Sequence, residues 1–278
     1  DTRPAWIAAR DPHLEVASPP LGLFARHDGQ SPLCAHASCS GALRDAGMLS
    51  DGRVWFTRGE GFDAGDMGAY VWSPASQTVN RLRSGDEILF GCNGGDGELY
   101  CLQETPAHPR RLVAVNATSG ALRVLYDPNR AWNDASSPRI ERLEFTDDHG
   151  LQSYIHLVYP SSYQPGRRYP MVIVQYRSRG FLHGGTGGEY PIFAYAARGY
   201  FVMSVERPEA HALSERLSPQ AFDHLLNFEG EEERMKLVSL DHFITEVERR
   251  GLVDPNAIAI TGTSCSGYGG AWEIRVPL

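Results

Sequence analysis

The sequence has little positive charge and no long apolar run. Its 278 residues include 26 lysines and arginines against 34 aspartates and glutamates, which gives a formal net charge of −8. Nucleic-acid-binding proteins are usually basic, so this balance argues against a nucleic-acid partner. A membrane helix needs about 18 or more consecutive apolar residues. The run PMVIVQY (170–176) has only the length of a buried strand, so no membrane span is predicted.

Cysteine is scarce, and four of the five cysteines form two close pairs. Cys34 and Cys39 flank AHAS, Cys92 and Cys101 flank NGGDGELY, and the fifth is Cys265. The two pairs predict two local disulfides and an oxidising compartment, with four reduced thiols as the alternative. Neither pair has the two-residue spacing typical of zinc sites. The sequence therefore predicts no metal site, and it shows no cofactor motif.

Helical patterns are absent from residues 1–130, where short strands alternate with polar turns. An Asp-Gly turn at 51–52 recurs at 96–97, an offset of 45 residues. A period of this size, with four short strands per unit, is typical of β-propeller blades. Two such units are visible, and residues 1–40 are expected to hold part of an earlier one. The alternative to a propeller fragment is an open β-sandwich. The expected strands are 51–58, 69–73, 78–83, 96–104, 110–116 and 120–126.

The second half has a different pattern, in which buried strands alternate with helices. Residues 127–140 are rich in Pro, Asn, Asp and Ser and predict a linker at 131–139 between domains at 1–130 and 140–278. An antiparallel strand pair is expected around DDHG (147–150), followed by a parallel α/β unit. Its expected strands are 169–176, 200–205 and 257–261, and its helices are 190–199, one opening at Ser218-Pro219, and 231–250.

The helix over 231–250 should bury one face and begin in solvent. Its apolar face is expected to hold Leu237, Leu240, Ile244 and Val247, with Gly251 as the C-terminal cap. The acidic stretch EGEEER (229–234) predicts a solvated helix start.

The segment AIAITGTSCSG (257–267) predicts a strand that runs into a nucleophile elbow. This strained strand-to-helix turn exposes a serine hydroxyl and tolerates only small residues two positions to either side of it. Gly262 and Ser266 meet this requirement for Ser264. Ser266 is rejected as the nucleophile because Tyr268 would then occupy a crowded position. The turn also directs the backbone N–H of Cys265 into the site as an oxyanion donor.

A base for this serine is missing from the expected place. In α/β-hydrolases the triad order is Ser, then an acid, then His. No histidine follows Ser264, and the only acid after it, Glu273, is too close to the elbow. The tail GYGGAWEIRVPL does not resemble the apolar helix that should follow, so we expect a chain truncated near Gly267. His183 is expected to serve its loop and not to act as the catalytic base. The other histidines before the elbow are no better candidates for the base: His149, His156, His211, His224 and His242.

The propeller-like repeat, the linker and VDPNAIAITGTSCSG together resemble the prolyl oligopeptidase family of serine peptidases. That family joins a β-propeller to an α/β-hydrolase domain, and its elbow usually reads G-x-S-x-G-G. Here Ser266 replaces the first trailing glycine. Within the family, the stretch 172–209 is most similar to the lasso peptide isopeptidases, which hydrolyse the isopeptide bond of threaded peptides. The resemblance extends to about Gly267.

The resemblance implies a fold and a set of site residues. The fold would be the last two to three blades of a propeller followed by the N-terminal half of an α/β-hydrolase domain. Ser264 matches the nucleophile, the Cys265 N–H matches one oxyanion donor, and the Tyr176 hydroxyl matches the second. The alternative for Tyr176 is an aromatic residue that only fills the strand end. Arg177 and Arg179 are candidates for binding a substrate carboxylate, with exposed loop residues as the alternative.

The resemblance also implies an activity, a partner and a location. The expected activity is hydrolysis of a lasso peptide isopeptide bond through an acyl-enzyme on Ser264, and it should be lost in a truncated chain. A dipeptidyl or acylaminoacyl peptidase, or a non-catalytic binding protein, are the alternatives. The expected partner is a peptide, and the oligomeric state is left open. Together with the cysteine pairs, the resemblance implies a periplasmic or secreted protein, although the sequence shows no signal peptide.

Overall fold

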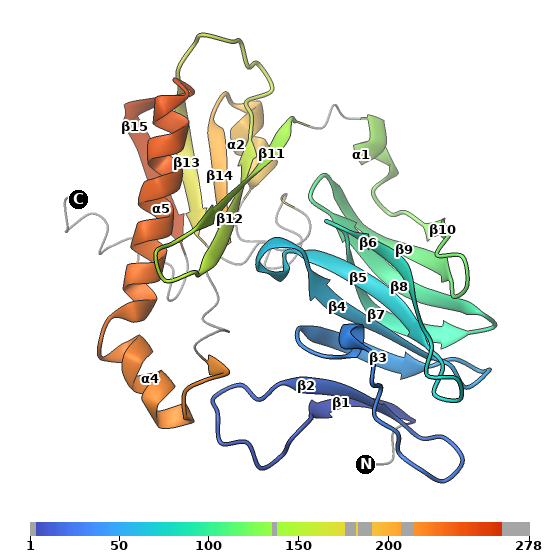
Figure 1. Ribbon diagram of the computed structural model, residues 1–278. Helices are drawn as coiled ribbons and strands as arrows, with labels where there is room; N and C mark the ends of the chain where they lie inside the picture. Colours follow the sequence, from blue (N-terminus) through green and yellow to red (C-terminus); the bar gives the residue numbers. More distant parts are fainter. Residues whose placement is uncertain (1–3, 135–137, 176–181, 183–190, 207–213, 263–278) are drawn as a thin grey trace. The chain divides into compact units, whose positions relative to one another are not determined.

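A computed structural model describes residues 4–134, 138–175, 182, 191–206 and 214–262 (Figure 1). The chain divides into two compact units. The first unit comprises Asp1–Asn133 and Leu213–Pro219, and the second comprises Asp134–Ala212 and Gln220–Leu278. The short segment Leu213–Pro219 therefore belongs to the first unit although the chain on either side of it belongs to the second.

The first unit consists of antiparallel sheets whose strands follow one another in chain order. A two-stranded sheet pairs β1 (Ala5–Ala9) with β2 (Leu21–Ala25). Two four-stranded sheets follow, with bounds β3 (Leu43–Met48), β4 (Val54–Glu60), β5 (Asp66–Trp72), β6 (Val79–Gly85), β7 (Ile88–Gly95), β8 (Glu98–Thr105), β9 (His108–Asn116) and β10 (Leu122–Tyr126). The six predicted strands are confirmed as β4–β6 and β8–β10. The sequence missed β3 and β7, and the described residues form no closed sheet.

The sheet β3–β6 is buried on both faces because neighbouring side chains of a strand point in opposite directions. On β4, Val54 and Phe56 pack into a cluster with residues of β1 and β2, whereas Trp55 packs into a cluster with residues of β7–β9. All three side chains are at most 3% exposed. The sheets of this unit therefore stack through apolar faces.

Two disulfides lie in these apolar clusters. Cys34 is bonded to Cys39, and Cys92 to Cys101, which are the pairs favoured by their proximity in sequence. Cys34 and Cys39 belong to the cluster beside β1 and β2, and Cys92 and Cys101 to the cluster between the four-stranded sheets. Each bond therefore closes a short loop inside the core of the unit.

A short helix, α1 (Arg130–Asp134), lies in the segment predicted as an irregular linker. The indole Nε1–H of Trp132 donates to the carbonyl oxygen of Ala107 at 3.1 Å. Nearby, the side chain of Asn129 donates to the carbonyl oxygen of Arg110 at 3.4 Å. The chain that leaves β10 is thus fastened to the β8–β9 hairpin by an aromatic anchor, which the polar composition of the segment did not indicate.

One glycine makes the turn between β9 and β10 possible. Gly120 has φ +71°, and a Cβ atom added there would lie 2.0 Å from the backbone oxygen of Leu82 in β6. The guanidinium of Arg83 also donates to the Gly120 oxygen at 3.3 Å. This turn therefore rests directly on the backbone of the neighbouring sheet, and a side chain at this position has no space.

We predict that Gly120→Ala destabilises the first unit by at least about 2 kcal/mol more than Gly97→Ala. Gly97 is the matched control, because its φ is +75° but nothing lies within 4 Å of its added Cβ. Both variants carry the cost of a left-handed alanine, and only Gly120→Ala adds a clash with backbone. Urea unfolding of the two variants measures the difference. Equal losses of stability would contradict the close approach.

The second unit is built on a five-stranded mixed sheet in the order β11-β12-β14-β13-β15. β11 and β12 are antiparallel, β14 is antiparallel to β12, and β13 is parallel to both β14 and β15. This confirms the predicted antiparallel pair and the predicted parallel strands. The bounds are β11 (Ile140–Thr146), β12 (Gln152–Val158), β13 (Tyr169–Gln175), β14 (Phe201–Glu206) and β15 (Val253–Gly262).

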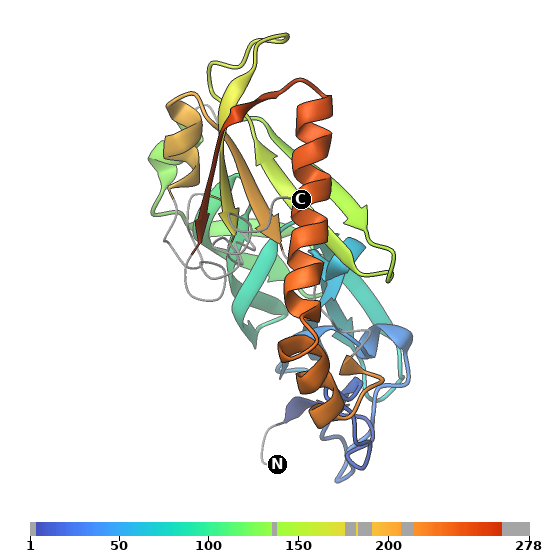
Figure 2. The same ribbon diagram turned by 90° about the vertical axis from the view of Figure 1, so that its left-hand side faces the viewer.

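Helices cover both faces of this sheet (Figure 2). Figure 2 shows α2 (Ile192–Ala197) and α5 (Glu231–Arg249) on opposite sides of the strands. α2 contacts β12 and β14, and α5 contacts β11 and β15. α4 (Pro219–Asn227) precedes α5 and begins at the proline that follows Ser218, as predicted. Gly251, which follows the C-cap residue Arg250, has φ +69°, and this confirms it as the glycine that ends the helix.

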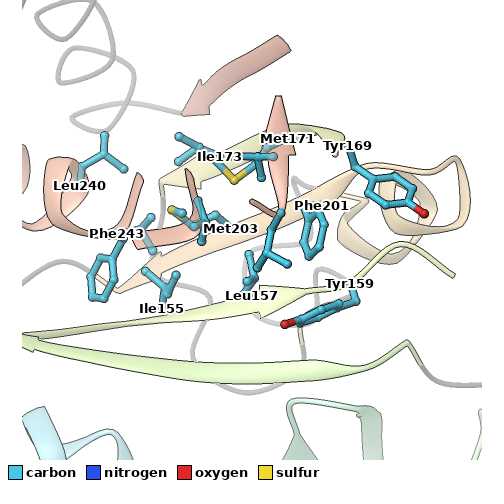
Figure 3. Packing of buried hydrophobic residues seen from close by; sticks show 14 residues of the cluster. Ile155, Leu157, Tyr159, Tyr169, Met171, Ile173, Phe201, Met203, Leu240 and Phe243 are labelled. Atoms are coloured by element: carbon cyan, nitrogen blue, oxygen red, sulfur yellow. The ribbon is translucent and has the colours of Figure 1, made fainter. Parts of the chain in front are cut away.

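The core of the second unit lies between the sheet and α5 (Figure 3). Odd-numbered residues of the strands, such as Ile155, Ile173 and Met203, meet Phe243 from the helix. The predicted helix face was partly wrong. Leu240 and Val247 are buried, and Ile244 is partly buried and packs against the core, as predicted. Leu237 is only partly buried and is not part of this core, and the remaining buried positions are Glu231, Met235, Ser239 and Phe243.

The acidic start of α5 is also not solvated as predicted. Glu231 is 8% exposed, and the guanidinium of Arg234 donates to both of its oxygens at 2.8 and 2.7 Å. Arg234 also donates to Asp147 Oδ2 at 2.8 Å. Burial raises the pKa of Asp147, but bonds from Arg234 and from the N–H groups of Leu151 and His149 outweigh it and lower the pKa overall. The turn between β11 and β12 is therefore tied to the first turn of α5.

Candidate active site

The predicted site residues follow the ends of two neighbouring parallel strands. Val174 of β13 lies opposite Ser204 of β14 and Thr261 of β15, and Gln175 lies opposite Gly262. Because these strands are parallel, their carboxyl ends meet at one edge of the sheet, which we call the carboxyl edge. Ligand sites of α/β proteins typically lie at such an edge.

The residues expected to perform the chemistry lie outside the described part of the chain. Tyr176 comes directly after Gln175, and Ser264 comes two residues after Gly262. The other candidates outside the described residues are Cys265, Arg177, Arg179, His183 and Glu273. The structure therefore brings together the strands that precede Tyr176 and Ser264. The catalytic roles of these two residues remain predictions.

Below the carboxyl edge, polar side chains form two rows across the sheet, and the sequence analysis did not find them. Residues in register point to the same side of a sheet, here the face opposite the core of Figure 3. The lower row contains Arg142, His156 and Ser204, and after the apolar Val174 of β13 it ends with Thr261. The upper row contains Glu144, Tyr154 and Glu206.

Arg142 connects the two rows. Its guanidinium carbon lies 4.1 Å from the centre of the Tyr154 ring, and its Nε lies 3.2 Å from Glu144 Oε1. A cation over an aromatic face is attractive, and more so away from water. Tyr154 also meets the His156 ring edge to face, with centroids 5.5 Å apart. The arrangement places a positive charge, a buried aromatic ring and an imidazole together on a face that is only partly covered, since Arg142 and His156 are half-buried and Glu144 is exposed.

Two further polar residues of β14 are buried on the same face. Ser204 is 2% exposed and Glu206 is 4% exposed. Glu206 lies opposite Tyr154 at the carboxyl end of its strand. The alternation of polar residues along β12 and β14 was the sequence signal for this face. The sequence analysis interpreted both strands only as apolar sheet elements.

His156 is held neutral by its surroundings. Burial lowers the pKa of His156, and the positive charge of Arg142 lowers it further, from 6.5 to about 4. The imidazole is therefore uncharged at neutral pH.

We predict that the second unit loses stability as the pH falls from about 6.5 to about 4. In this window the unfolded chain binds a proton at His156 and the folded chain does not, so stability rises with pH. The loss at pH 5 should reach at most about 2 kcal/mol. Urea unfolding at pH 7 and pH 5 measures it. The difference should be smaller in His156→Leu and unchanged in the control His224→Leu, whose side chain is 63% exposed. An equal pH difference in both variants would contradict a depressed pKa at His156.

The described residues contain no group of three or more His, Cys, Asp or Glu that could hold a metal ion. None of the helices in the described part of the chain is long and apolar enough to cross a membrane.

No protein-family model matches the chain. A curated relative, the lasso peptide isopeptidase AtxE2 of Asticcacaulis excentricus, is 33% identical over 263 residues. The alignment covers 94% of this chain and 38% of AtxE2. The chain thus spans about two fifths of the length of this relative.

Solved structures give the same match. AtxE2 isopeptidase without ligand superposes with a TM-score of 0.85 over 95% of this chain and 41% of AtxE2. A serine-to-alanine variant of AtxE2 with Astexin3-dC4 bound gives 0.84 over 94% of this chain and 40% of that chain. An acylaminoacyl peptidase from Pyrococcus horikoshii, 19% identical, gives 0.64 over 93% of this chain and 41% of its own, which shows a shared fold. The chain is therefore a homologue of lasso peptide isopeptidase AtxE2 over 94% of its length, and its structural neighbours are peptidases of the prolyl oligopeptidase type.

Proposed function

We propose that this chain carries the nucleophile of a serine peptidase of the prolyl oligopeptidase type that hydrolyses the isopeptide bond of a lasso peptide. The observation that carries the proposal is the 33% identity to AtxE2 over 94% of the chain. The register of the sheet supports it, because the strands that precede Tyr176 and Ser264 are neighbours at the carboxyl edge. The AtxE2 variant structure with Astexin3-dC4 bound supports a peptide as the partner.

The proposed roles follow from where the strands end. A nucleophile elbow needs a strand that stops at the carboxyl edge, and β15 extends to Gly262, two residues before Ser264. The Cys265 N–H would supply one oxyanion donor. Tyr176, one residue beyond β13, would supply the other from the adjacent strand.

In the proposed reaction, the Ser264 hydroxyl oxygen attacks the isopeptide carbonyl carbon while a histidine takes the hydroxyl proton. The carbonyl oxygen becomes an oxyanion that Cys265 N–H and Tyr176 O–H stabilise. The C–N bond then breaks, and the histidine donates its proton to the departing amine. Water, deprotonated by the same histidine, attacks the acyl-enzyme and releases a carboxylate and the free serine.

The base and its orienting acid are not assigned to residues of this sequence. No histidine follows Ser264 within these 278 residues, whereas the triad order of α/β-hydrolases requires one. We therefore propose that these 278 residues alone do not activate Ser264. In the complete catalytic unit a histidine and a carboxylate from further chain would do so.

The first unit would select the substrate. We propose that its two four-stranded sheets are blades of a β-propeller, and that this unit favours compact peptides. We also propose a periplasmic or secreted location, with which the Cys34–Cys39 and Cys92–Cys101 disulfides agree.

We predict that the protein expressed from its whole gene opens a threaded lasso peptide, and that Ser264→Ala lowers this rate by about four orders of magnitude or more. Mass spectrometry detects the gain of one water. The matched control is Ser266→Ala, which changes the neighbouring serine and should keep most of the activity. A fluorophosphonate probe should label Ser264 in that protein and not in the isolated 278 residues.

Each alternative has its own outcome. Cleavage of linear aminoacyl substrates without opening of the threaded peptide would instead assign a dipeptidyl or acylaminoacyl peptidase. Binding of the threaded peptide with neither cleavage nor probe labelling would assign a non-catalytic protein. Labelling of the isolated 278 residues at Ser264 would show that a base lies within them.

A further inference from the structure

The amino ends of the parallel strands meet at the edge of the second sheet opposite the carboxyl edge, and we call it the amino edge. There Tyr169 of β13 lies opposite Val253 of β15, and Ile140 of β11 lies opposite Val158 of β12. The loop between β12 and β13 and the C-terminal end of α5 lie at this end of the unit (Figures 1 and 2). Four parts of the chain bring arginines to this edge, namely Arg139, Arg167, Arg168, Arg198, Arg249 and Arg250.

Contacts around Tyr159 join the end of α5 to the start of β11. The Arg250 guanidinium donates to Glu141 Oε2 at 2.9 Å and lies 3.2 Å from the Tyr159 hydroxyl oxygen. The guanidinium carbon of Arg139 lies 4.1 Å from the centre of the Tyr159 ring, and the Arg139 side chain is 61% exposed. An aromatic face attracts a guanidinium, so Tyr159 holds Arg139 in place at the surface.

Neighbouring rings extend this surface across the loop between β12 and β13. The Tyr163 ring packs against Tyr159 with centres 4.9 Å apart, and against Tyr169 with centres 5.9 Å apart. The guanidinium carbon of Arg167 lies 5.1 Å from the centre of the Tyr169 ring. A second arginine is therefore held over an aromatic ring at the same edge.

The end of α2 completes this surface. The Ser161 N–H donates to the Ala196 oxygen at 3.1 Å, which fastens the loop between β12 and β13 to the last turn of α2. Arg198 follows α2 directly and is exposed. The rings of Tyr195 and Tyr200 lie on either side of it in sequence, with centres 6.4 Å apart. Direct contacts thus connect the parts of the chain that bring arginines to the amino edge.

The amino edge is positive although the chain as a whole is acidic. Six arginines lie there with four acidic residues, so 6 − 4 leaves a net charge of +2, against −8 for the whole chain. The four acidic residues are Glu141, Glu246, Glu248 and Asp254. In the part of the chain that the structure describes, no acidic side chain pairs with Arg167, Arg168 or Arg198, and all three are exposed.

These features fit a partner that presents many phosphate groups on one surface. A guanidinium donates to two phosphate oxygens at once, and it stays charged at every physiological pH. Because the arginines come from four parts of the edge, an extended anionic surface can contact more of them than one small anion can. Tyr163, Tyr195 and Tyr200 are half-buried at the same edge, and tyrosine rings favour the boundary between lipid and water.

We propose that the amino edge binds the anionic surface of a lipid membrane through contacts between its guanidinium groups and headgroup phosphates. The amino and carboxyl edges lie at opposite ends of β13, so a bound protein directs its carboxyl edge away from the lipid. The proposal concerns a different edge from the proposed reaction site, and its measurements need no peptidase activity.

The first test uses the unmodified protein, expressed from its whole gene, and co-sedimentation with lipid vesicles. We expect binding to vesicles of phosphatidylcholine mixed with phosphatidylglycerol, and no binding to vesicles of phosphatidylcholine alone. Raising the NaCl concentration from about 0.05 M to about 0.5 M should release the protein, because salt screens exposed charges. Absence of binding to the anionic vesicles at low salt would overturn the proposal.

The second test locates the binding surface with Arg167→Gln/Arg168→Gln/Arg198→Gln. Each arginine beside an anionic membrane strengthens binding by about five-fold, so this variant should bind the anionic vesicles at least about twenty-fold more weakly. The matched control is Arg10→Gln/Arg81→Gln/Arg216→Gln, which removes the same charge from exposed positions of the first unit. The control should keep its affinity within about three-fold, since those charges lie away from the amino edge.

Two results of the second test would contradict the proposal. Equal losses of affinity in both triple variants would show that total charge, and not the amino edge, governs the binding. A smaller size of the amino-edge variant on size-exclusion chromatography, without vesicle binding by the unmodified protein, would assign this edge to contact with a second copy of the acidic chain. Urea unfolding checks that both variants keep the fold, and the dependence on lipid and salt tests the unmodified protein in any case.

Discussion

The second unit depends on the position of β13 between two parallel partners. Its residues from Met171 to Val174 are at most 8% exposed, with Met171 and Ile173 in the core of Figure 3 and Val172 and Val174 on the opposite side of the sheet. A parallel strand of this kind must be covered on both faces, which the helices on opposite sides of the sheet help to achieve. Because β14 and β15 both take their register from β13, the alignment of the whole carboxyl edge follows from this one strand.

The two faces of that sheet differ in composition and in role. The face toward α5 is apolar and gives the unit its stability through burial. The opposite face carries charged and hydrogen-bonding side chains, of which Arg142 and His156 are half-buried and Glu206 is buried. Such groups are costly to bury unless they interact with one another. A polar face that extends to the carboxyl edge would give a site at that edge fixed dipoles and charges, which water could not provide with the same order.

Much of the fold could be predicted from the sequence, and the errors have physical causes. Strands such as β4 and β9 were predicted because their apolar residues alternate or run continuously. β3 and β7 were missed because residues such as Asp45, Gly47 and Gly94 interrupt any alternation. In α5 the prediction wrongly included Leu237 in the buried face. Which residues of a helix are buried depends on how the helix packs against the sheet, and the helix sequence alone does not determine this. Met235 and Phe243, which the prediction did not include, are buried instead.

Only part of the candidate site could be predicted from the sequence. The elbow pattern around Ser264 is local, so a short stretch of chain predicts it. The polar rows depend on pairing between residues that are far apart, such as His156 and Ser204, and no local pattern reveals that pairing. The same holds for the ion pair between Asp147 and Arg234, which are 87 residues apart; Arg234 belongs to the stretch that the sequence analysis predicted as a solvated helix start.

The strand order of the second unit also has a consequence for synthesis on the ribosome. β13 is complete at residue 175, but its partner β15 is complete only at residue 262, which is 262 − 175 = 87 residues later. At about 5 to 20 residues per second, one edge of this apolar strand stays without its partner for roughly 4 to 17 seconds. During that time the nascent chain exposes a template for wrong strand pairing. A chaperone that binds the nascent chain during this interval would protect this edge of β13 from wrong pairing.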